Sequence, residues 1–169
     1  LALVRYASEW DWASGESEFL KTFAINPNYA EAHAYYSHLL NMVGRPKEAM
    51  EQIELALKLD PHNPLIKSMY GVDLTFVRRF DEAISVSLEA LKMDPTNPVA
   101  LIALATAFYS TGRLEEALEP WKSYCYNTYK GIAHAFDQGY TKAGCVGALS
   151  FEADTLAAQS KTNFVLPGD

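Results

Sequence analysis

Proline recurs along this chain at a fixed interval of 34 residues. Pro27, Pro61 and Pro95 each close a similar phrase, and two of the phrases are nearly identical: residues 57–61 are LKLDP and residues 91–95 are LKMDP. A period of this length indicates a repeat protein, in which one small structural unit stacks on the next. The period therefore restricts the fold class before any local propensity is considered.

Small residues recur in the same register as the prolines. They are Ala49, Ala83 and Ala117, each after a glutamate, then Ala56 and Ala90, and finally Gly44 and Gly112, with Arg78 in the corresponding position between them. This pattern resembles the tetratricopeptide repeat, a pair of antiparallel helices whose small residues mark the places where the helices touch. The resemblance implies an all-α fold, a right-handed superhelix (solenoid) of antiparallel helix pairs.

The period also divides the chain into units. We expect a partial repeat at 1–29, full repeats at 30–63 and 64–97, a fourth repeat with an irregular second helix at 98–129, and a degenerate helix pair or cap with a linker at 130–169. Helices are expected near residues 1–9, 12–25, 30–42, 46–59, 65–77, 81–93, 99–110, 114–127, 131–141 and 146–161. Because the first unit is incomplete and starts at Leu1, we expect a piece of a longer protein.

Turn residues support these boundaries. Gly44 tolerates the positive φ that often ends a helix, and Pro46 suits the first turn of the next helix, where no N–H is needed. Asp81 is expected to cap the second helix of the third unit. Pro120 falls inside the expected helix 114–127, where a missing N–H bond predicts a kink or an early break.

Composition limits the functions open to the chain. With 49% hydrophobic and 21% charged residues, it is typical of a globular protein. The net charge of −7 and a single basic doublet, Arg78-Arg79, disfavour direct binding of nucleic acid. The longest apolar run, residues 101–108, is too short to span a bilayer, so no membrane insertion is expected. We expect a cytoplasmic location, although a longer parent protein could place this segment outside the inner membrane.

Signatures of catalysis are missing from the sequence. It has no glycine-rich phosphate loop and no His-Glu-x-x-His motif. His33 and His38 are five residues apart, so they diverge on a helix and do not form the i, i+4 pair that binds zinc. We interpret one as a packing histidine and the other as facing the groove. Neither an enzymatic activity nor a cofactor or metal is expected.

The resemblance implies that the first helix of each pair lines a concave groove. Its inward positions predict these partner-binding residues: His38, Asn41, Met42, Ser68, Val72, Thr75, Phe76, Ile102, Thr106 and Tyr109. A mixed apolar and neutral polar groove of this kind suits an extended peptide or helix with apolar anchors. For each residue, the alternative is that it packs against a neighbouring repeat.

One specialised role is not expected. Some chaperone-binding members of the family hold a terminal carboxylate with lysine and asparagine, but here the corresponding positions are Ala34, His38, Met69, Val99 and Ala103.

The sequence therefore predicts a protein–protein interaction module that binds a peptide segment, or another domain of its own parent, in the groove. The chain also looks like the repeat region of larger bacterial regulatory proteins. An alternative is a sensory domain that binds a small ligand and controls an attached output domain, with a closed pocket beside the C-terminal helices. A spacer that oligomerises is a third reading, and a homodimer through exposed solenoid edges is compatible with each.

Overall fold

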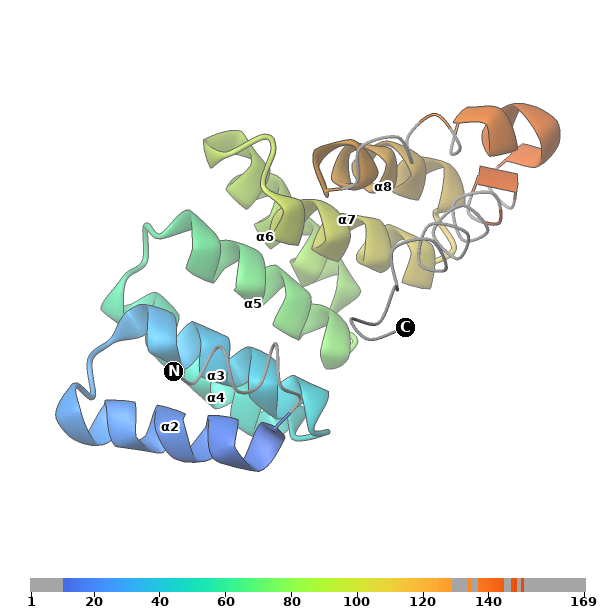
Figure 1. The fold of residues 1–169 in the computed structure, drawn as a ribbon. Helices are drawn as coiled ribbons and strands as arrows, with labels where there is room; N and C mark the ends of the chain where they lie inside the picture. Colours follow the sequence, from blue (N-terminus) through green and yellow to red (C-terminus); the bar gives the residue numbers. More distant parts are fainter. Residues whose placement is uncertain (1–10, 129–133, 135–136, 145–146, 149, 151–169) are drawn as a thin grey trace, which may run out of the picture.

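The computed structural model describes residues 11–128, 134, 137–144, 147–148 and 150. Residues 11–128 form seven α-helices joined by short turns (Figure 1). They are α2 (Trp12–Ile25), α3 (Ala30–Met42), α4 (Pro46–Leu59), α5 (Pro64–Phe76), α6 (Phe80–Met93), α7 (Pro98–Ser110) and α8 (Leu114–Thr128). The described part of the chain contains no β-strand. The expected all-α repeat solenoid is confirmed.

The helices match the sequence prediction closely. α2, α3 and α4 begin and end at the predicted residues. α5, α6 and α7 each begin one residue earlier, α5 also ends one residue earlier, and α8 ends one residue later. The expected helix at 1–9 lies outside the described residues. Of the predicted last unit, residues 134, 137–144, 147–148 and 150 are described and all are helical, including 142–144, which were expected in the turn between the two helices. The assignment of repeat units stays a prediction.

Asparagine–proline pairs lie at the start of α5 and α7, each of which is the first helix of a helix pair. The Asn63 side chain accepts hydrogen bonds from the backbone N–H groups of Leu65 and Ile66, and proline follows at the first helical position. Asn97 caps α7 in the same way. A capping side chain satisfies backbone donors that have no partner within the helix, and proline lacks such a donor. These pairs therefore fix where α5 and α7 begin.

The second helices begin differently. Arg79 is the N-cap residue of α6, and its side chain makes no capping hydrogen bond. The Arg79 Nε instead donates a hydrogen bond to Glu82 Oε1 at 2.6 Å. The same pair recurs 34 residues away on each side, as Arg45 with Glu48 and Arg113 with Glu116. The expectation that Asp81 caps this helix is wrong, because α6 begins at Phe80 and Asp81 already lies in its first turn.

Turns within each pair need a left-handed backbone. Gly44 and Gly112 have φ values of 79° and 76°, as expected for glycines that end a helix. The equivalent residue between them, Arg78, adopts a φ of 62°, which is unfavourable for a residue that carries a Cβ atom. The fold thus imposes the repeat geometry on a residue that does not favour it.

Replacing Arg78 with glycine is expected to raise the free energy of unfolding by about 0.5–1 kcal/mol, because glycine adopts this φ without strain. Arg78→Ala is the matched control, since it removes the same exposed side chain but keeps the Cβ atom. Urea denaturation of the three proteins measures the difference. Equal stability of the glycine and alanine variants would show that the backbone at this turn is not strained.

Pro120 lies within α8, and the helix continues past it to Thr128. Of the two predicted outcomes, the early break is therefore wrong, and the kink stays a prediction. Packing explains the continuity, because α8 is anchored on both sides of the proline by buried residues, Ala117 before it and Cys125 after it. The carbonyl of Glu116, which loses its intrahelical partner, belongs to an exposed residue near the helix start, where water can replace the bond.

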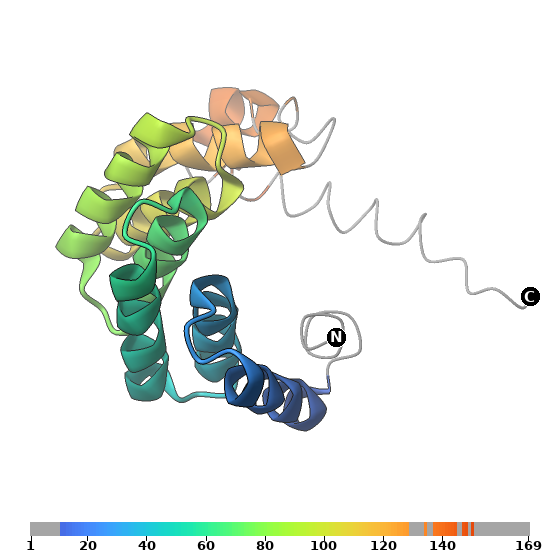
Figure 2. The same cartoon turned by 90° about the vertical axis from the view of Figure 1, so that its left-hand side faces the viewer.

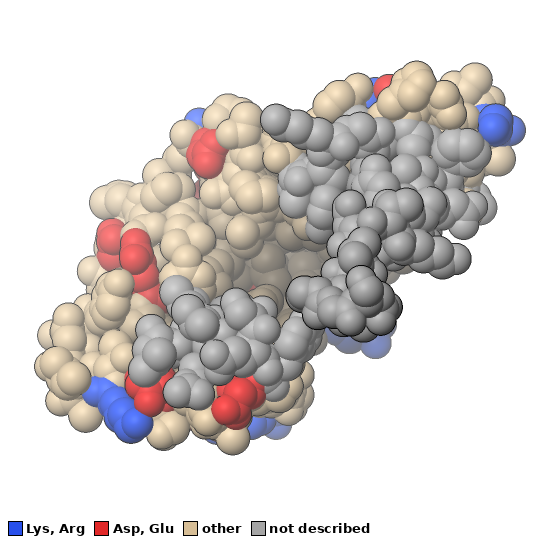
Figure 3. All heavy atoms as spheres, in the orientation of Figure 1, with Lys and Arg blue, Asp and Glu red and all other residues tan. Residues whose placement is uncertain are grey.

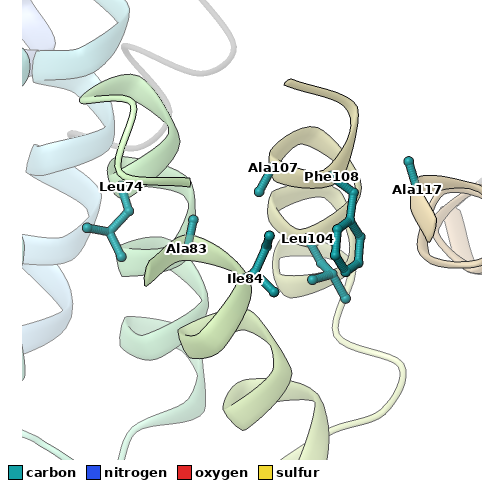
Figure 4. Close-up of a cluster of buried hydrophobic side chains, with 7 residues drawn as sticks. All are labelled: Leu74, Ala83, Ile84, Leu104, Ala107, Phe108 and Ala117. Atoms are coloured by element: carbon teal, nitrogen blue, oxygen red, sulfur yellow. The ribbon is translucent and has the colours of Figure 1, made fainter. Parts of the chain in front are cut away.

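The helices follow an arc. α5 packs against both α3 and α7, and Figure 2 shows α4 and α6 on the outer side of the arc. The recurrent alanines lie between helices: Ala49 and Ala83 are fully buried, and Ala117 is 6% exposed. In the cluster of Figure 4, Ala83 of α6 lies near Leu74 of α5. The first helices consequently face the inside of the arc.

Candidate functional site

Two adjoining cavities lie along the first helices. The larger, about 360 Å³, is lined by Tyr35 and His38 of α3, Leu65, Met69, Val72 and Asp73 of α5, and Val99 and Ile102 of α7. The second, about 300 Å³, is lined by Val72, Thr75, Phe76, Ile102, Ala103 and Thr106. Val72 and Ile102 line both, so the two cavities are neighbours. We call this surface the α3–α5–α7 groove.

The structure brings together six of the ten predicted binding residues. His38, Val72, Thr75, Phe76, Ile102 and Thr106 line the groove. Met42 and Tyr109 are 43% and 52% exposed but line neither cavity. Whether any of these residues contacts a partner stays a prediction.

Two predicted residues lie beneath the surface of the groove. Ser68 is fully buried, and its hydroxyl donates a hydrogen bond to the Pro64 carbonyl oxygen at 2.6 Å. Asn41 is 5% exposed, and its Nδ2 donates to Asp73 Oδ1 at 2.7 Å. Neither side chain faces the open groove, because each is held by a bond within or between the first helices. Burial of Ser68 and the bond from Asn41 to α5 agree with the alternative stated for these residues, in which the side chain packs within the repeats.

Asp73 is the residue that sequence reasoning missed. It is 1% exposed, lines the larger cavity, and its Oδ2 has no hydrogen-bond partner among the described residues. Burial raises the pKa of this carboxyl to about 7, against the opposing influence of Ser37 and Asn41. The Ser37 hydroxyl itself donates to the Ala34 carbonyl oxygen at 2.7 Å. A buried ionisable group thus lies beside a cavity lined mainly by apolar residues, with Tyr35 and His38 as its other polar side chains.

The two histidines of α3 take different roles, as predicted. His33 is buried, stacks on Phe23 with ring centroids 4.2 Å apart, and has its ring nitrogens 2.7 Å from Gln52 Oε1 and 2.8 Å from the Pro27 carbonyl oxygen. It is a packing residue. His38 lines the cavity, and burial lowers its pKa, which favours the neutral ring.

A third cavity, about 310 Å³, lies between α8 and the helical residues 137–144. Its lining is charged: Glu115, Leu118, Glu119, Lys122, Asp137 and Tyr140. Lys122 Nζ pairs with Asp137 Oδ1 at 2.6 Å, and the Tyr140 hydroxyl donates to Glu115 Oε2 at 3.2 Å. These contacts attach residues 137–144 to α8.

Surface charge adds little to the site. On the face shown in Figure 3, lysine and arginine side chains of the described residues are separated from one another and form no continuous basic patch. Among the described residues, no helix has the length and apolar character needed to cross a membrane.

Known proteins resemble this chain in part of its sequence and in its fold. Residues 78–119 match a family model described as tetratricopeptide repeat. A search of curated proteins found no match. Among solved structures, the crystal structure of MamA is 17% identical, with 94% of each chain covered and a TM-score of 0.64. PilW, a type IV pilus biogenesis factor, is 17% identical, with 92% of this chain and 73% of PilW covered and a TM-score of 0.73.

A further solved structure of the same fold is YrrB, described as a tetratricopeptide-repeat protein with an unusual peptide-binding site. It is 17% identical, with 93% of this chain and 87% of YrrB covered and a TM-score of 0.58. The sequence match over residues 78–119 and the shared fold together confirm the resemblance to the tetratricopeptide-repeat family that the 34-residue period indicates.

Proposed function

We propose that this chain is a protein-interaction module that holds an extended peptide segment in the α3–α5–α7 groove. The observation that carries the proposal is the pair of neighbouring cavities on the inner helices, with Val72 and Ile102 common to both linings. Apolar pockets along a continuous groove can each take one side chain of an extended peptide, while polar residues between them orient its backbone.

The chemistry of the groove supports a peptide over a charged ligand. Leu65, Val99 and Ile102 provide apolar surface, and Thr75 and Thr106 provide neutral hydroxyl groups. Phe76 remains 41% exposed at one end, where it offers a further aromatic contact. YrrB, which shares the fold, is described as binding a peptide, and this adds support. We further propose that the module is the regulatory part of a larger cytoplasmic protein.

The alternative, a sensory domain for a small ligand, is favoured by one observation: the cavity between α8 and residues 137–144 lies where such a pocket is expected. However, its charged side chains pair with one another through the Lys122–Asp137 and Tyr140–Glu115 contacts. A ligand would have to compete with those contacts. The apolar groove therefore supports the peptide-binding function better.

Peptides that bind the full chain would be selected from a random-peptide display library. The affinity of these peptides for the unmodified chain and for two variants tests the proposal. Ile102→Glu places a charge on a residue that lines both cavities and is expected to weaken binding at least about tenfold, because a carboxylate would lose hydration against the peptide. Leu88→Glu is the matched control, since Leu88 is 44% exposed on α6 and lines neither cavity.

Circular dichroism would establish that both variants keep the helical fold. Selected peptides that bind Ile102→Glu as tightly as the unmodified chain would rule out the groove as their site. An equal loss of affinity in both variants would also contradict the proposal, because the effect would then not depend on the groove.

A further inference from the structure

Two buried side chains on neighbouring helices share one hydrogen bond and leave two acceptors over. Asn41 Nδ2 of α3 donates to Asp73 Oδ1 of α5 at 2.7 Å, and the two residues are 5% and 1% exposed. Asn41 Oδ1 and Asp73 Oδ2 both lack a hydrogen-bond partner among the described residues. Buried polar atoms in native proteins are nearly always paired, so two such exceptions in bonded groups call for a common explanation.

A single proton accounts for both atoms. An amide oxygen and a carboxylate are acceptors and cannot satisfy each other, whereas a protonated carboxyl has an O–H donor. With the proton on its Oδ2, Asp73 donates to Asn41 Oδ1 and accepts from Asn41 Nδ2, which closes a pair of bonds between α5 and α3. The nearby Ser37 hydroxyl has one proton, and that proton bonds to the Ala34 carbonyl oxygen at 2.7 Å.

The surroundings of the carboxyl favour its protonated form. Burial raises the pKa of Asp73 to about 7, and no charged neighbour contributes to this shift. α7 carries no charged residue, and α4 and α6 meet α5 through apolar or small side chains such as Ile53 and Ala83. α3 contributes the titratable Tyr35 and His38, which line the cavity. Burial lowers the pKa of His38, which favours the neutral ring.

Resting on the peptide-binding function proposed above, we propose that Asp73 and Asn41 form a closed acid–amide pair that switches the groove with pH: the peptide binds tightly while Asp73 Oδ2 holds its proton and more weakly once that proton has left. On ionisation the O–H bond breaks, the proton passes to water, and the electron pair stays on Oδ2. The second bond of the pair is then lost, and a negative charge lies beside the cavity.

The switch acts through this charge and not through contact with the peptide. Asp73 is nearly without exposure, so its carboxyl is not offered to a ligand as an acceptor. Water in the neighbouring cavity of about 360 Å³ stabilises a carboxylate behind the cavity wall, and an apolar peptide side chain displaces that water. Binding therefore raises the pKa of Asp73 further, and by linkage a lower pH strengthens binding.

Peptide affinity at two pH values tests the switch on the full chain. The probe is a peptide selected from the random library, with blocked termini and without histidine, cysteine or acidic residues, so that it does not titrate itself. If binding raises the pKa of Asp73 by about one unit, the dissociation constant should increase about fivefold between about pH 6 and about pH 8.

Asp73→Asn is the matched variant, because its amide N–H replaces the carboxyl O–H as the donor to Asn41 and does not titrate. Its affinity for the peptide should stay close to the low-pH value of the unmodified chain at both pH values. Ser37→Ala keeps both members of the pair, so the pH dependence should persist in it. Loss of the pH dependence in Ser37→Ala would assign the effect to Ser37 and overturn the pair.

The proton can also be followed without a peptide. In a carbon NMR titration of the free chain, the Asp73 carboxyl carbon should show a midpoint near pH 7, and the side-chain amide protons of Asn41 should shift with the same midpoint. A midpoint near about pH 4, the value of a hydrated aspartate, overturns the proposal. An affinity that does not fall as the pH rises, or that falls equally in Asp73→Asn, overturns it as well.

The outcome is separable from that of the proposed function. If selected peptides depend on Ile102 but bind equally at both pH values, peptide binding in the groove stands and the switch is wrong. If no selected peptide depends on Ile102 but the free chain shows the raised midpoint of Asp73 and the matching shift of Asn41, the protonated pair stands and the proposed function is wrong.

Discussion

Replacing Ala83 with leucine is expected to lower the free energy of unfolding by about 1–3 kcal/mol. Ala83 is fully buried on α6 and belongs to the cluster that contains Leu74 of α5 and Leu104 of α7 (Figure 4). Protein interiors are closely packed, so three additional carbon atoms at this position must push helices apart or force side chains out of their preferred rotamers. Urea denaturation followed by circular dichroism measures the loss.

Ser85→Leu is the matched control for this substitution. Ser85 lies on the same helix, two residues along, but is exposed, so a leucine there adds similar bulk without entering the helix contact. Its effect should stay within about 0.5 kcal/mol. If Ala83→Leu were as well tolerated as Ser85→Leu, the recurrent alanine would not mark a close contact between helices, and the structural meaning of the 34-residue period would be wrong.

Replacing Asp73 with asparagine is expected to change the pH dependence of stability. The folded-state pKa of the Asp73 carboxyl is raised from 3.8 to about 7, mainly by burial. The folded protein therefore binds a proton that the unfolded chain has released at intermediate pH. The contribution of this group is fully present below the unfolded pKa and is lost as the pH rises towards the folded pKa.

Asparagine has a similar shape and does not titrate. The unfolding free energy of Asp73→Asn minus that of the unmodified chain should therefore increase by about 2–3 kcal/mol between about pH 5 and about pH 8. The elements around Asp73 contribute His38, Ser37 and Asn41 from α3 and the apolar Val99 and Ile102 from α7. Titration of other groups is common to both proteins and cancels in the difference.

Denaturation curves for both proteins at the two pH values test this directly. A difference that is the same at about pH 5 and about pH 8 would mean that Asp73 titrates as it does in an unfolded chain, and the carboxyl would then be hydrated rather than enclosed. A difference that falls with pH would have the opposite sign from that required by a raised pKa.

The helices were predictable because their signals are local and periodic. Proline, asparagine and glycine fix helix ends through their backbone chemistry, and the structure places α2, α3 and α4 at the predicted residues. The Arg–Glu pairs that begin the second helices were also visible, since arginine at 45, 79 and 113 keeps the same 34-residue register. These pairs are exposed, and surface ion pairs have little effect on which helix forms.

The site was less predictable because it depends on contacts between helices. Asp73 was missed because an acidic side chain is almost never fully buried, so an aspartate within an apolar stretch of sequence gives no sign that it is enclosed in the structure. Asn41 was placed in the groove from its position in the repeat, yet it bonds to Asp73 on the neighbouring helix. Sequence position gives the side of a helix, whereas the burial of a residue depends on its neighbours.

The central claim is that the inner helices bind the partner. Backbone amide NMR of the full chain, titrated with a peptide selected from the random library, tests it most directly. We expect the chemical-shift changes to concentrate on the groove residues of α3, α5 and α7, with those of His38, Val72 and Ile102 among the largest. Changes concentrated on the outer helices α4 and α6, with these three residues unaffected, would contradict it.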